Sequence, residues 1–150
     1  MRTLIVAWSV VASAVASSDT ARILHPLEPI DHGSIACGCT AHMITEQSAR
    51  DFYASPEILV LDPNGKPPNA RVNLGRGNVL LSPAKPIEFP LYHCVAGEVW
   101  ISEWQSDAVT VRAELSAPNP GEESCGFTGE VVATGNGRQE VTPVGVACGC

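Results

Sequence analysis

The stretch AVTVRAEL at residues 108–115 decides the fold class of this chain. Every second residue from Val109 to Leu115 is apolar, and the residues between them are threonine, arginine and glutamate. Successive side chains of a strand point to opposite faces of a sheet. This period of two therefore predicts a β-strand with one face buried and the other in water.

Similar short runs, separated by Gly, Pro and Asn turns, fill the chain on both sides of this stretch. The further strands that we expect lie at residues 57–61, 70–74, 79–81, 87–94, 99–104, 131–134 and 139–146. Turn signals at a spacing of about 8 to 12 residues are typical of an all-β sandwich. We therefore expect an immunoglobulin-like or similar antiparallel β-sandwich of about seven to eight strands. It would contain one short helix at most, between Thr45 and Pro56.

The first residues have the pattern of a secretory signal peptide. Arg2 supplies a positive charge, residues 4–15 are an apolar run, and Ala14-Val15-Ala16 is a small-residue cleavage signature. We expect a signal peptide at 1–16, an N-terminal arm at 17–31 that contains Pro26 and Pro29, and a single sandwich domain at 32–150. The predicted location is secreted or periplasmic.

The charge of the chain disfavours two classes of partner. All 16 acidic residues follow the predicted cleavage site but only 8 of the 9 basic ones do, so the mature formal charge is 8 minus 16, or −8. Such a protein is not expected to bind nucleic acid or an anionic membrane surface. No later apolar run approaches the roughly 18 residues of a membrane span, so we expect no membrane insertion. The sequence does not identify a protein partner.

Six cysteines form an even set, which in an exported chain ordinarily means disulfides. One repeat stands out among them, because Ala36-Cys37-Gly38-Cys39 recurs as Ala147-Cys148-Gly149-Cys150. On a strand, residues two apart share a face, so each motif presents two sulfurs side by side. We expect the two motifs to lie together on adjacent terminal strands. Cys94 and Cys125 remain, and we expect a structural disulfide between them.

Three chemistries could follow if the four sulfurs of the two motifs converge. Two cross-strand disulfides would staple the ends of the chain and contribute roughly 4 to 5 kcal/mol on the chain-entropy model. Alternatively, the thiolates would bind a soft metal, Cu(I) or Zn(II), with His42 or Met43 assisting and His32 close by in sequence. The third alternative is a redox-active disulfide inside one Cys-Gly-Cys motif.

Cys37-Gly38-Cys39 is similar in kind to the Cys-x-Cys pair of copper-delivery proteins that face the same compartment on an immunoglobulin-like sandwich. By analogy, the first hypothesis is an exported protein that binds or buffers copper or another soft metal by ligand exchange. Its ligands would be Cys37, Cys39, His42, Met43, Cys148 and Cys150. The alternative is a disulfide-stapled extracytoplasmic binding or structural module with no metal.

No enzyme signature stands out along the chain. It has no G-x-S-x-G elbow, no H-E-x-x-H and no phosphate-binding glycine loop, so we expect no catalysis. Trp100 and Trp104 would share one face of a strand, where they could stack on a sugar or a peptide. With only 5% aromatic residues in the chain, we favour a role for both rings in the core.

Overall fold

The computed structural model describes residues 22–31, 38–46, 48, 51–62, 68–85, 95–117 and 125–149. These residues form an all-β structure with one short 3-10 helix, η2. The strands are β1 (Gly38–Met43), β2 (Glu57–Asp62), β3 (Asn69–Asn73), β4 (Asn78–Pro83), β5 (Val99–Gln105), β6 (Thr110–Ser116), β7 (Cys125–Gly135) and β8 (Arg138–Gly149). The expected all-β class is confirmed.

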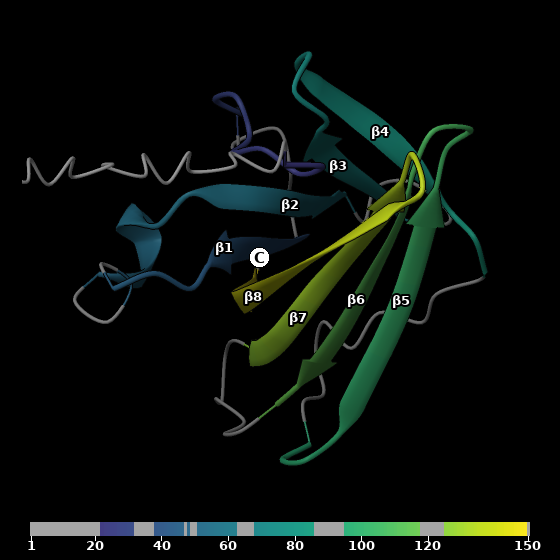
Figure 1. The fold of residues 1–150 in the computed structure, drawn as a ribbon. Helices are drawn as coiled ribbons and strands as arrows, with labels where there is room; N and C mark the ends of the chain where they lie inside the picture. The colour runs from purple at the N-terminus through teal and green to yellow at the C-terminus, as the bar shows by residue number, and fades with distance from the viewer. Residues whose placement is uncertain are drawn as a thin grey trace, which may run out of the picture.

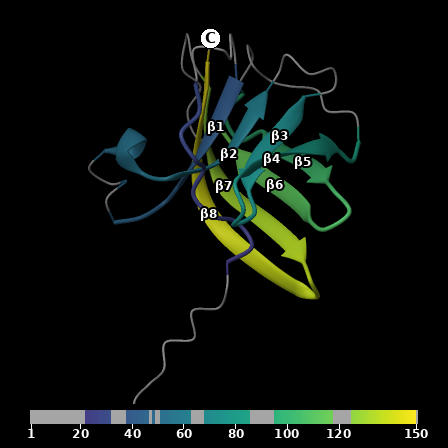
Figure 2. The same ribbon diagram turned by 90° about the horizontal axis from the view of Figure 1, so that it is seen from above.

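The eight strands form a closed antiparallel barrel rather than the expected sandwich. Each strand pairs with the next along the chain, and β8 returns to pair with β1, beside which it lies in Figures 1 and 2. A sandwich strand and a barrel strand both bury every second residue, so the alternation in the sequence does not distinguish them. The pairing of β1 with β8 makes the difference.

The interior of the barrel is filled by the alternating side chains that identified the strands. Val111, Ala113 and Leu115 of β6 are buried in the core, whereas Arg112 and Glu114 between them form an ion pair at 3.0 Å outside it. Trp104 is fully buried, and its indole Nε1–H donates to the carbonyl oxygen of Pro68 at 3.3 Å. The core role favoured for this ring is confirmed.

The second tryptophan is only partly buried. Trp100 packs against the core and stacks on Phe127, with the ring centroids 6.2 Å apart. Both tryptophans therefore belong to the inner face of β5, and Trp100 lies nearer the surface.

Two hairpins follow the expected turn chemistry. The turn between β3 and β4 holds Gly75 and Gly77 at φ +86° and +100°, which strongly favours glycine. The turn between β7 and β8 is Asn136-Gly137, with φ 51° and 69°, and this pair is typical of a tight type I′ hairpin.

Strands β7 and β8 are 11 and 12 residues long, longer than the sequence predicted. The extra part of β7 contains Gly126 and Gly129, and glycine is uncommon in strands. Gly129 lies where β7 approaches β6 so closely that a Cβ would overlap the backbone carbonyl oxygen of Glu114. A residue that weakens the strand signal in the sequence is thus needed for contact between the strands.

The short helix expected between Thr45 and Pro56 is reduced to η2 (Phe52–Ala54) in the described residues. Thr45 and Ser48 satisfy each other's backbone N–H groups through their side-chain oxygens, at 2.7 and 3.3 Å. This exchange resembles a helix cap, although only the three residues of η2 are helical. The strand expected at 87–94 and the signal peptide at 1–16 lie outside the described residues.

The segment 22–31 lies along β3, β4 and β8 without forming a strand of its own. His25 forms a single β-bridge with Asn73, and Glu28 exchanges two hydrogen bonds of 3.0 Å with the side chain of Asn78. Leu24 is buried in the core, 2% exposed, and its N–H donates to Glu140 Oε2.

Candidate functional site

The candidate site lies where the first and last strands close the barrel, which we call the seam. Six residues of β1, from Gly38 to Met43, pair with six of β8, from Val144 to Gly149. In this register Cys39 lies directly opposite Cys148. Directly opposite residues of an antiparallel pair point to the same face, so the two thiol-bearing side chains meet.

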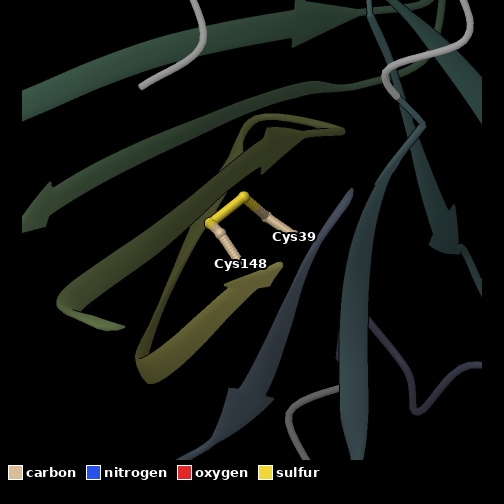
Figure 3. Close-up of a disulfide and its surroundings, with 2 residues drawn as sticks. All are labelled: Cys39 and Cys148. Atoms are coloured by element: carbon tan, nitrogen blue, oxygen red, sulfur yellow. A yellow bond between two sulfur atoms is a disulfide. The ribbon is translucent and has the colours of Figure 1, made fainter. Parts of the chain in front are cut away.

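Cys39 and Cys148 form a disulfide across the seam, with their Cα atoms 4.0 Å apart. Figure 3 shows the bond between the two strands. Both residues belong to the core, with exposed fractions of 2% and 4%. The expectation that the two Cys-Gly-Cys motifs lie side by side on adjacent terminal strands is confirmed for this pair of cysteines.

A third cysteine occupies the same row of the barrel wall. The backbone of Cys125 in β7 is in register with Cys148, on the side of β8 opposite to Cys39. Three cysteines therefore hold neighbouring register positions on β1, β8 and β7. The expected disulfide between Cys94 and Cys125 stays a prediction, because Cys94 lies outside the described residues.

The two auxiliary ligands expected on β1 have other partners. His42 is buried, its Nδ1 is 3.0 Å from the carbonyl oxygen of Ser55, and its ring is perpendicular to that of Tyr53, with the centroids 6.0 Å apart. It therefore contacts the connection between β1 and β2. Met43 packs against the core, and its sulfur accepts a weak contact from Arg22 Nη1 at 3.9 Å.

Of the six ligands expected from the sequence, the described structure brings together Cys39 and Cys148. Cys37, Cys150 and the nearby His32 lie outside the described residues. Within the described residues, no group of three or more His, Cys, Asp or Glu side chains is placed to hold a metal ion. A disulfide also lacks the thiolate that a soft metal requires, so in this oxidised state the chemistry of the pair is structural.

The outer side of the seam carries a small open pocket that the sequence did not indicate. Its volume is about 270 Å³, and it is lined by Thr40 and His42 of β1, Glu57 of β2, Ala147 of β8, and Tyr53. The sequence did not predict that Tyr53 and Glu57 line this pocket, because no spacing in the sequence connects them with β8. The signal that did find the seam was the repeated tetrapeptide.

No family model matches this chain, and comparisons with curated proteins and with solved structures found no significant match. In the described residues, no helix is both long enough and apolar enough to cross a membrane.

Proposed function

We propose that this protein is an exported, non-catalytic binding module whose barrel is locked by a disulfide between its first and last strands. The observation that carries the proposal is the Cys39–Cys148 bond across the seam. Disulfides persist in oxidising compartments and are rare in the cytosol, which supports the export that the signal-like residues 1–16 predict.

The separation of the two cysteines in sequence determines how much stability the disulfide contributes. The two cysteines are 109 residues apart in sequence, so their bond restricts almost the whole unfolded chain. On the chain-entropy model a loop of this length corresponds to roughly 4 to 5 kcal/mol of stability. The staple keeps the barrel closed. The hairpin turns and the N-terminal arm can then differ in sequence to bind a ligand without loss of the fold.

The test is to replace both cysteines, as Cys39→Ser with Cys148→Ser, and to compare metal content and stability with the parent protein. A staple predicts no stoichiometric metal in either protein by elemental mass spectrometry. It also predicts that denaturant unfolding of the variant loses about 2 to 5 kcal/mol. Ser102→Ala, which alters another buried residue without touching the seam, is the control. A variant as stable as the parent would refute the staple.

A second candidate, binding of Cu(I) or Zn(II) by the reduced protein, is favoured by the row of three cysteines. An external dithiol that is itself oxidised to a disulfide would reduce the seam bond to two thiols. Cys125 holds the next register position on β7. Thiolates are the ligands that Cu(I) prefers. His42, Met43, Cys37 and Cys150 would complete or exchange with this set in the proposal made from the sequence.

The second candidate is tested by titrating the fully reduced protein with Cu(I) in competition with a chromophoric chelator. Metal binding predicts one tightly bound ion. Cys148→Ser should weaken its binding at least about tenfold, because even mutation of the residues that orient a metal's ligands has this effect. Thr142→Ser, on the same strand, should leave the affinity unchanged. Equal affinity of the reduced parent and Cys148→Ser would refute a site at the seam.

A further inference from the structure

An open pocket of about 370 Å³ lies at the end of the barrel formed by the hairpin turns. Four elements line it: the N-terminal arm, the β3–β4 turn, the β5–β6 turn and the β7–β8 hairpin. This volume lies within the range of small-molecule sites in proteins. The pocket lies away from the seam disulfide, because Arg138 begins β8 and Cys148 is near its end.

Three arginines from separate parts of the chain line this pocket. Arg22 comes from the arm, Arg76 from the β3–β4 turn and Arg138 from the start of β8. They are three of only nine Lys and Arg residues in a chain of formal charge −7. The described residues that line the pocket include no carboxylate. A concentration of positive charge in an acidic protein attracts an anion to this place.

The guanidinium groups of these arginines are available to a ligand. Within the residues that the structure describes, none of the three forms an ion pair with a carboxylate, whereas Arg112 on the barrel wall pairs with Glu114. Among the described residues, the one polar contact of the Arg22 guanidinium is with the sulfur of Met43, a weak acceptor, at 3.9 Å. The nearby Glu140 receives the backbone N–H groups of Ile23 and Leu24 on its Oε2.

Apolar residues line the same pocket as the arginines. Ile23, Leu74 and Val109 line the pocket, and Val109 is only 5% exposed, while Ile23 and Leu74 pack against the core. A site that is lined by both charged and apolar groups suits a ligand with one anionic end and one apolar end.

The backbone around the pocket is held in place before any ligand arrives. At Gly135 a Cβ would be 2.9 Å from the carbonyl oxygen of Ala108, so the β7–β8 hairpin touches the β5–β6 turn directly. That turn is closed by a hydrogen bond of 2.9 Å from Ser106 N–H to Val109 oxygen. A pocket that is already ordered loses less conformational entropy when a ligand binds to it.

We infer that this pocket binds a small amphipathic anion, with a carboxylate or phosphate head held by Arg22, Arg76 and Arg138 and an apolar body on Ile23, Leu74 and Val109. The inference rests on the proposed function and gives the binding module its ligand class. Guanidinium groups bind both kinds of head through paired hydrogen bonds, so the two share one chemistry.

Calorimetric titration of the full oxidised chain tests this inference, with octanoate, octyl phosphate, octanol and inorganic phosphate as probes. The pocket variant is Arg76→Gln with Arg138→Gln. Its matched control is Lys85→Gln with Arg112→Gln, which removes the same charge outside the pocket. We expect one or both amphipathic anions to bind the parent and the control equally, and the pocket variant at least about tenfold more weakly.

The probes that bind identify the head group of the ligand. Binding of octanoate alone assigns a carboxylate head, binding of octyl phosphate alone assigns a phosphate head, and binding of both supports the shared chemistry. The inference is overturned if neither anion binds, if the pocket variant binds as tightly as the parent, or if octanol or inorganic phosphate binds as tightly as the amphipathic anions. Circular dichroism and thermal melting establish that each variant is folded.

The salt dependence of binding to the parent protein is a second test. Raising the salt concentration from about 0.02 to 0.2 M should weaken binding to the parent protein, because salt screens exposed charges. An affinity that does not change with salt would also overturn the inference. The proposed function is tested separately by the stability and metal content of the cysteine variant, so failure of one test leaves the other intact.

Discussion

At Gly129 of β7 a side chain has no room, because its Cβ would overlap the carbonyl oxygen of Glu114 on the neighbouring strand. We expect Gly129→Ala to force β6 and β7 apart and to lower the free energy of unfolding by about 1 to 3 kcal/mol or more. Denaturant unfolding measures the loss. Gly126→Ala, on the same strand with open space around its Cβ, should be neutral or slightly stabilising. Equal effects of the two substitutions would contradict the close approach.

Single residues also show what the sequence can and cannot predict. The position of Trp100 and Trp104 on one face of their strand followed from their spacing, because strand geometry is local. The partner of His42 did not follow, because Ser55 belongs to a connection whose course depends on the fold. Arg22, Arg76 and Arg138 have no common spacing, and only the closed barrel brings the arm, the β3–β4 turn and the start of β8 to one pocket.

One carboxylate of β8 accepts two hydrogen bonds from the start of the N-terminal arm. Glu140 Oε2 accepts hydrogen bonds from the N–H groups of Ile23 and Leu24, which positions Leu24 in the core. We expect Glu140→Ala to leave both donors without this partner and to cost about 1 to 3 kcal/mol. Hydrogen exchange should show faster exchange in residues 22–31.

Glu130→Ala is the matched control for the arm, because this glutamate is exposed on β7 and its removal takes away the same charge. It should leave both stability and exchange of the arm unchanged. If Glu140→Ala behaves in the same way as the control, the arm is held by its other contacts, such as those of His25 and Glu28.

At the scale of strands, the local pattern predicted β2, β6 and both hairpins because alternation and turn residues are encoded within a few positions. Closure of the barrel was not predictable in this way. It depends on β1 pairing with β8, whose residues are about a hundred positions apart, and alternation within each strand is the same in a sandwich. The repeated Ala-Cys-Gly-Cys was the one long-range signal, and it correctly placed β1 beside β8.

At the scale of the whole molecule, the described strands form a barrel whose seam is closed by a disulfide inside the core. Cys39 and Cys148 are 2% and 4% exposed, so a reductant cannot reach their bond without local opening of the barrel. We expect dithiothreitol to reduce this disulfide at least about tenfold more slowly in native buffer than in denaturant, since access limits thiol attack. Timed alkylation followed by mass spectrometry measures both rates. Equal rates would contradict burial of the bond.

The central claim is that the first and last strands meet at a seam held by Cys39 and Cys148. Disulfide mapping of the natively oxidised protein tests it most directly, by non-reducing proteolysis followed by tandem mass spectrometry that cleaves the backbone beside Gly38 and Gly149. The account predicts that Cys39 is joined to Cys148. A bond from Cys39 to any other cysteine, or an alkylatable Cys39 thiol in the oxidised protein, would contradict it.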